Sequence, residues 1–187
     1  MNKLLSIAFL LVALSTQAQD KFASTWMCKA GKVHFFSSTP MEDIEATSNT
    51  ALCALDTTSK KVYAQIKITS FTFPSALMQD HFNENYMESG KYPMSELNGV
   101  IVEDIDFKKD GVYDVTFRGT LEMHGVKHQR DIKVKLIIKG GQPVNASGSF
   151  DVRLADHKIE VPTAVFTKIA ESIKVDVNFD FTKYSKS

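Results

Sequence analysis

The stretch VYDVTFRGTLEMHGVKHQRDIKVKLIIK, residues 112–139, decides the fold of this 187-residue chain. In its first half, apolar side chains recur at nearly every second position, and they are Tyr113, Val115, Phe117, Leu121 and Met123. In its second half, the same alternation gives Val126, Ile132, Val134, Leu136 and Ile138. Alternation with a period of two is typical of strands with one buried and one solvated face. With His124-Gly125 as the turn, the stretch predicts an antiparallel hairpin.

The same alternation recurs along the rest of the chain. Its clearest repeat, near the C-terminus, comprises Ile173, Val175, Val177, Phe179 and Phe181. Weaker repeats occupy residues 62–68, 101–107 and 150–154. After Ser70 the apolar phase moves from even to odd positions, which predicts a bulge or bend there. Because short turns such as 109–111 and 140–141 separate neighbouring segments, we expect a meander of about eight antiparallel strands.

One stretch shows helical periodicity, and it begins after Pro74-Ser75 and ends at Ser89-Gly90. Its apolar side chains are Met78, Phe82 and Tyr86, four apart, with Leu77 beside them. A second segment, 155–171, is irregular, with a short helical turn expected around 166–170. Closing the strands into a barrel removes exposed edges. The predicted fold is therefore all-β, an eight-stranded antiparallel barrel with one short helix between strands and a small irregular helical segment.

Composition and charge exclude two classes of protein. The chain has 22 basic and 22 acidic side chains, and 43% of its residues are hydrophobic. A zero formal charge without a basic run argues against nucleic-acid binding, and a disordered chain would hold fewer apolar residues. We therefore expect a globular domain and no nucleic-acid partner.

The N-terminus has the pattern of a signal peptide. A short basic start containing Lys3 precedes an apolar stretch from Leu4 to Leu14 that is too short to span a bilayer. We expect a signal peptide over 1–18 and a mature domain over 19–187, located in the periplasm or secreted. No later segment reaches the roughly 18 apolar residues of a membrane helix, so stable membrane insertion is not expected.

Two cysteines, Cys28 and Cys53, fall in a chain expected to enter an oxidising compartment. If residues 38–43 form a hairpin loop, residues whose numbers sum to about 81 face each other, and this pair meets that condition. A disulfide is one interpretation, and two separate buried thiols are the other. No C-x-x-C spacing indicates a redox or zinc centre.

An eight-stranded barrel is either filled by its own side chains or holds one slender ligand, and both interpretations stay open at this point. The inward candidates for ligand contact are Phe71, Phe73, Phe107, Tyr113, Phe117, Met123, Phe150, Val177 and Phe179. The helix could cover one end of the barrel as a lid, with Met78, Phe82 and Tyr86 on its underside. His128 and Arg130, in the apolar phase near the 124–125 turn, are candidates for holding a phosphate head group.

An enzymatic alternative depends on His81, Glu84 and Glu88, which share a helix face and could bind zinc with His124. The chain lacks H-E-x-x-H, G-x-S-x-G and a Gly-rich phosphate loop. A His/Glu/Glu face opposite an apolar face is also typical of a solvated helix surface. We therefore expect no enzyme activity and no metal or cofactor. A filled barrel with a structural or adaptor role is the third interpretation.

Several motifs resemble one known family. They are Phe71-Thr72-Phe73, His81-Phe82-Asn83-Glu84, Tyr86-Met87-Glu88-Ser89, Lys91-Tyr92-Pro93, the run Gly-Thr-Leu-Glu-Met-His-Gly-Val at 119–126, Gly148-Ser149-Phe150 and Ile159-Glu160-Val161-Pro162. Together they make nearly all of the mature chain similar to the YceI-like family. The resemblance implies a periplasmic, lipocalin-like extended barrel that binds a polyisoprenoid or another long apolar lipid in its lumen, without catalytic residues. A homodimer is left open.

Overall fold

Eight long antiparallel strands form this protein, whose computed structural model describes residues 22–160 and 169–185. The strands are β1 Thr25–Ser38, β2 Asp43–Asp56, β3 Lys61–Lys67, β4 Met94–Ile101, β5 Gly111–Met123, β6 Val126–Lys139, β7 Gln142–Arg153 and β8 Ser172–Asp180. A two-residue strand, β9 Thr182–Lys183, pairs with the beginning of β1.

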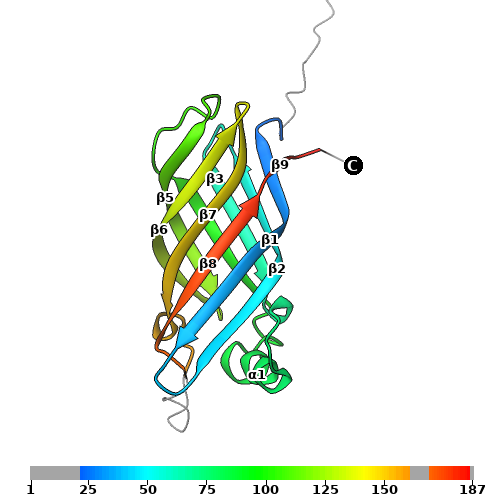
Figure 1. Cartoon of the computed structure of the whole chain (residues 1–187), viewed down its shortest axis with the longest axis vertical. Helices are drawn as coiled ribbons and strands as arrows, with labels where there is room; N and C mark the ends of the chain where they lie inside the picture. The colour runs from blue at the N-terminus through cyan, green and yellow to red at the C-terminus, as the bar shows by residue number, and fades with distance from the viewer. Residues whose placement is uncertain (1–21, 161–168, 186–187) are drawn as a thin grey trace, which may run out of the picture.

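The eight strands close into a barrel (Figure 1). Their hydrogen-bonded order is β2-β3-β4-β5-β6-β7-β8-β1, and β1 also pairs with β2. Each of these strands therefore has a partner on both sides, which removes the exposed edges that an open sheet would leave. The predicted meander and its closure are confirmed.

The β5–β6 hairpin follows the sequence pattern from end to end. Its register runs without interruption from Gly111 opposite Ile138 to Met123 opposite Val126. The two turn residues, His124 and Gly125, have φ values of 52° and 70°. Two successive positive φ values are what a two-residue hairpin turn with the right twist requires.

One end of the barrel carries the helical segments of the described residues, and we call it the mouth end (Figure 1). The 3₁₀ turn η1 Ile68–Ser70 follows β3, and α1 Ala76–His81 continues into the π-helical turn η2 Phe82–Tyr86. A second 3₁₀ turn, η3 Leu154–His157, follows β7. The change of phase expected at Ser70 is thus a bend made by η1, and the predicted helix is α1 with η2. Leu77, expected on the apolar side of this helix, is 64% exposed.

The strand expected over 101–107 is wrong, because β4 ends at Ile101. Glu103 ends the ladder by placing its carboxylate where the next strand residue would pair: Oε2 accepts a hydrogen bond from the backbone N–H of Thr116 at 2.6 Å. Asp106 then accepts a hydrogen bond from the Lys108 N–H at 2.9 Å and makes a turn. Residues 102–110 are therefore a loop at the far end of the barrel.

Both ends of the first hairpin have the register expected from the residue numbers, and between them the register shifts locally around Gly31. Cys28 lies opposite Cys53, and Ser38 lies opposite Asp43. The signal peptide expected over 1–18 and most of the turn expected around 166–170 fall outside the described residues. Within the described ranges, no helix is long and apolar enough to cross a membrane.

Candidate functional site: an apolar cavity in the barrel

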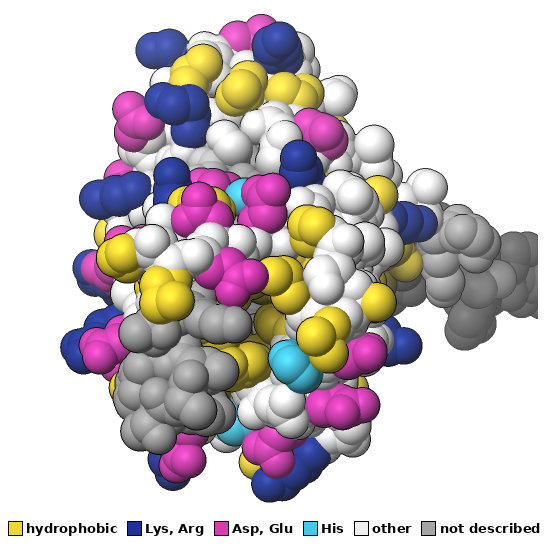
Figure 2. Space-filling view, turned by 60° about the horizontal axis from the view of Figure 1, so that its bottom comes forward, with side chains coloured by type: hydrophobic (Ala, Val, Ile, Leu, Met, Phe, Trp, Pro, Cys, Tyr) yellow, Lys and Arg dark blue, Asp and Glu magenta, His cyan; other side chains and the backbone are white. Residues whose placement is uncertain are grey.

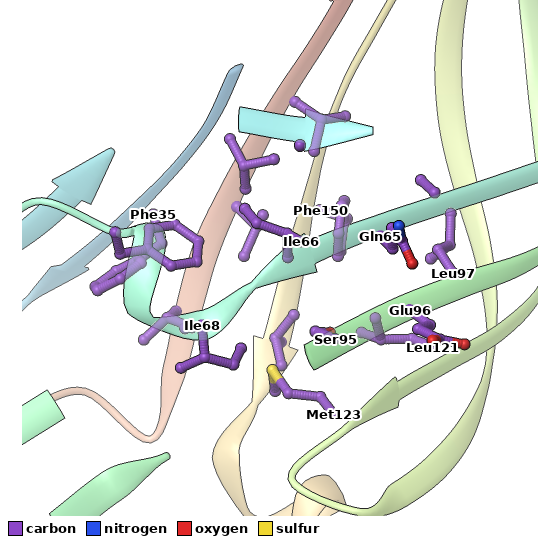
Figure 3. A pocket seen from close by; sticks show the side chains of 18 of the residues that line it. Phe35, Gln65, Ile66, Ile68, Ser95, Glu96, Leu97, Leu121, Met123 and Phe150 are labelled. Carbon is purple, nitrogen blue, oxygen red and sulfur yellow. The ribbon is translucent and has the colours of Figure 1, made fainter. Parts of the chain in front are cut away.

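The barrel encloses a cavity of about 440 Å³ that all eight strands line. Figure 3 shows part of its wall, where hydrocarbon side chains such as Phe35, Ile66 and Phe150 surround the space. The cavity reaches the mouth end, because Glu42, Leu77 and His81 border it there. Seen toward that end, hydrophobic side chains lie inside a hollow (Figure 2).

Small side chains at inward positions leave room for this cavity. Ala51, Cys53, Ala64 and Ala146 are all buried and all line it. An eight-stranded barrel is only just wide enough to be filled by its own side chains. Alternating bulky and small inward residues therefore decides whether the lumen is solid or hollow, and here it is hollow.

Four phenylalanines pack together between the helical segment and the barrel. The Phe82 ring, from η2, lies 5.5 Å from Phe35, 5.7 Å from Phe71 and 5.0 Å from Phe73, measured between ring centroids. Phe35 belongs to β1, while Phe71 and Phe73 follow η1. These aromatic contacts hold α1 and η2 against the cavity at the mouth end.

The two buried serines of the inner wall, Ser37 and Ser95, are hydrogen-bonded within the protein. Ser95 donates a hydrogen bond to the carbonyl oxygen of Glu122 at 2.9 Å, and the Ser37 hydroxyl oxygen accepts one from the Ala170 N–H at 2.9 Å. Burial also raises the pKa of Tyr86 above its ordinary value, which keeps this phenol neutral. The interior therefore suits hydrocarbon, and a polar head group would meet Glu42, Ser75 and His81 near the mouth.

Ten of the fourteen residues predicted to contact a ligand line the cavity. They are Phe71, Phe73, Met78, Phe82, Tyr86, Phe117, Met123, Phe150, Val177 and Phe179. Two of the others lie toward the far end. Phe107 is buried in the 102–110 loop as part of the core, and the Tyr113 hydroxyl donates a hydrogen bond to the carbonyl oxygen of Lys109 at 2.8 Å.

The remaining two, His128 and Arg130, face η3 instead of the cavity. Arg130 Nη2 lies 3.5 Å from Oδ2 of Asp156, and His128 Nε2 lies 3.8 Å from the same oxygen. The neighbouring His157 is fully buried, and its Nδ1 contacts the carbonyl oxygens of Met123 and Val126. Burial lowers the pKa of His157, and the nearby Arg130 and His128 also lower it. A carboxylate of the protein thus occupies the place proposed for a phosphate.

The residues of the alternative metal site do not gather at one point. His124 Nε2 lies 2.8 Å from Oε2 of Glu88, a hydrogen bond that joins the end of the helical segment to the β5–β6 turn. His81, by contrast, borders the cavity mouth. Across residues 22–160 and 169–185, no group of three or more His, Cys, Asp or Glu side chains could hold a metal ion.

The two cysteines are buried, free thiols on adjacent strands. Burial, with a further contribution from Cys28, raises the pKa of Cys53 to about 12. The Cys53 thiol is therefore protonated at neutral pH and acts as a small apolar part of the cavity wall.

Sequence reasoning missed several residues of the wall. They include Phe35, Ile44, Ile66, Leu121, Ile132 and Ile173. Most lie on apolar faces that the alternation had already marked, so the period of two was sufficient to find them. Ser95 carried no such signal, because a polar side chain at an inward position breaks the alternation.

Comparisons with known proteins agree on one family. The model of the YceI-like domain matches residues 21–181. A polyisoprenoid-binding domain from Saccharophagus degradans has a TM-score of 0.67 and 14% identity, covering 87% of this chain and 99% of that one. BcnA from Burkholderia cenocepacia has a TM-score of 0.62 and 16% identity, covering 79% of this chain and 94% of that one.

A third solved structure, the YceI protein of Campylobacter jejuni, has a TM-score of 0.57 and 20% identity. It covers 73% of this chain and 81% of the other. At these identities the three structures establish a shared fold. No curated protein sequence matches the chain.

Proposed function

Because the chain belongs to the YceI-like domain family, we propose that it is an exported binding protein for a long apolar molecule, a polyisoprenoid or another lipid of similar shape. The ligand would occupy the barrel lumen. The activity is uptake and release, without covalent chemistry and without a cofactor. The N-terminal pattern of a basic start and a short apolar stretch supports export to the periplasm or beyond.

The observation that carries the proposal is the hollow, apolar lumen whose buried polar groups already have partners. Moving hydrocarbon from water into such a space is favourable by about 25 cal/mol per Å² of apolar surface. A ligand with polar groups along its length would lose hydrogen bonds to water and find few replacements inside. The lumen therefore selects for a chain that is apolar over most of its length.

The position of the helical segment α1–η2 supports a role in ligand entry. It borders the mouth through Leu77 and His81, and it is held by the Phe82 ring contacts. Met78 also faces the cavity, and its flexible thioether side chain adapts to ligands of different shape. We propose that this segment moves when a ligand enters or leaves.

The test is native mass spectrometry of freshly purified protein, followed by organic extraction and identification of the extracted molecule. We expect a mass above that of the chain and recovery of one long apolar compound per barrel. The same spectrum reports whether a homodimer forms. A protein that carries no lipid, and that also takes up no radiolabelled prenol from phospholipid vesicles, would overturn the proposal in favour of a structural or adaptor role.

Two variants of β3 make the test specific to the lumen. Ala64 lines the cavity, so Ala64→Phe should fill it and reduce prenol uptake. Lys67 is exposed at the end of the same strand, so Lys67→Ala should leave uptake unchanged. Circular dichroism would establish that both variants fold.

A further inference from the structure

Two aromatic rings of the cavity wall occupy the space beside glycines, where a side chain on the glycine would otherwise lie. Gly31 in β1 faces Phe179 in β8, since the two strands pair Lys32 with Asn178. A Cβ atom added to Gly31 would lie 2.4 Å from Cδ1 and 2.6 Å from Cε1 of Phe179. These distances are too short for real atoms, so the Phe179 ring occupies the space that a side chain at position 31 would need.

The second ring is Phe117, which covers a pair of opposed glycines. Gly99 in β4 lies directly opposite Gly119 in β5. A Cβ atom at either position would come within 2.7 Å or 2.6 Å, respectively, of Cζ of Phe117. Each would also approach the backbone of the neighbouring strand to less than 2.5 Å, so this pair tolerates no side chain at all.

The Phe179 ring lies far from the mouth, so its orientation affects the depth of the cavity. β8 runs from η3 at the mouth end toward the far end, and Phe179 is its last residue but one. The ring therefore lies in the deep part of the cavity, which it lines. If the ring swung inward, it would block the deep part and leave the mouth unaffected.

We propose that Gly31 determines the length of the apolar chain that this barrel accepts, by holding the Phe179 ring against the wall. This inference rests on the proposed function, and it names Gly31 as the residue that selects among apolar ligands by their length. Phe117, held in the same way over Gly99 and Gly119, keeps the middle of the lumen clear.

Gly31→Ala is the direct test, because the backbone permits it. Gly31 is not among the glycines with positive φ, which are Gly125, Gly140 and Gly141 in the described chain. Besides the Phe179 ring, the nearest atom to an added Cβ is the Ala51 carbonyl oxygen at 3.1 Å. The flexible Phe179 side chain would yield first, and it would turn into the lumen.

The assay is displacement of a fluorescent naphthylamine probe by a series of linear prenols of increasing length. For Gly31→Ala we expect affinity for the longest prenol to fall about tenfold, equivalent to about 1.4 kcal/mol, with little change for the shortest. Gly90→Ala is the matched control, because an added Cβ there meets nothing within 4 Å. The double variant Gly31→Ala/Phe179→Ala should restore binding of the long prenol.

The outcomes separate this inference from the proposed function. A wild-type protein that binds no prenol of any length refutes both. Wild-type binding with an unchanged length profile in a folded Gly31→Ala variant refutes only the role of Gly31. If Gly31→Ala does not fold, Phe179→Ala alone decides: the proposal requires stronger binding of prenols longer than the wild type prefers, and an unchanged profile refutes it.

Discussion

Replacing Phe82 by alanine should weaken the attachment of the helical segment to the barrel. The ring contacts Phe35, Phe71 and Phe73 at centroid distances between 5.0 and 5.7 Å. Each such pair contributes about 0.5–1.5 kcal/mol beyond the area it buries. Since Phe82 is only half-buried, the burial term is smaller than for a core phenylalanine, and we expect Phe82→Ala to lower the free energy of unfolding by about 3 kcal/mol.

Urea denaturation followed by circular dichroism measures this loss. For a domain of this size, a loss of about 3 kcal/mol moves the midpoint down by about 1.5 M if the slope is unchanged. Leu77→Ala is the matched control in the same segment, because Leu77 is 64% exposed. A surface substitution of this kind should stay within about 0.5 kcal/mol of the wild type.

Amide hydrogen exchange shows which part of the protein loses stability in Phe82→Ala. In Phe82→Ala, the amides of α1 and η2 should exchange faster than those of the β5–β6 hairpin, because the ring contacts that hold the segment are lost. Equal midpoints for Phe82→Ala and Leu77→Ala, with unchanged exchange in α1, would refute the idea that the aromatic cluster fastens the lid.

Four further substitutions test the barrel itself. Phe117→Asp places a carboxylate in the apolar lumen and should prevent folding or prenol uptake. The control variant Lys133→Ala, on the outer face, should bind prenol normally. Equal prenol uptake by both folded variants would contradict the assignment of the lumen as the binding site. Asp131→Asn breaks the exposed pair with Arg118, 2.7 Å between Oδ2 and Nη2, and should lower the unfolding free energy by less than about 1 kcal/mol in urea denaturation. Burial lowers the pKa of His157 below its ordinary 6.5. The stability that this neutral ring contributes is therefore complete above about pH 6.5 and is lost as the pH falls toward the lowered pKa. His157→Gln should flatten the pH dependence of the thermal midpoint below about pH 6.5, and an unchanged slope would contradict this.

Local periodicity was sufficient for the strands in which most inward residues are apolar. The β5–β6 hairpin is the clearest case, because its turn residues and its alternation both lie within one continuous stretch. The pairing at both ends of the first hairpin also followed from the position of its loop alone, but the register shift around Gly31 did not. In both cases the information is local, so no knowledge of the distant chain was needed.

β4 could not be recognised in the same way, because its inward positions include Ser95 and Gly99. Ser95 is tolerated inside because its hydroxyl reaches the carbonyl oxygen of Glu122, which belongs to the next strand. Gly99 is required because the β5 backbone and the Phe117 ring fill the space that a side chain would need. Both residues depend on β5, so the pattern within Met94–Ile101 does not reveal a strand.

His128 and Arg130 show the same limit for the site. Their inward phase was read correctly, but η3 brings Asp156 against them. The position of η3 depends on how the chain returns from β7 to β8, and no short-range pattern encodes that path. The charge that neutralises Arg130 therefore comes from a segment that is distant in sequence.

A hollow lumen makes the barrel less stable than a lumen filled by the protein's own side chains. Filling an apolar cavity with the protein's own methyl groups would stabilise the barrel, by about 1 kcal/mol for each methylene-sized void. The chain keeps alanine at positions 51, 64 and 146, where larger side chains would fill the space. It also keeps glycine at position 31, so that the Phe179 ring stays against the wall. These small residues lower the stability of the empty protein, and under the proposed function a bound apolar chain would restore it by occupying the same volume. The space is thus better explained by an occupant than by inefficient packing.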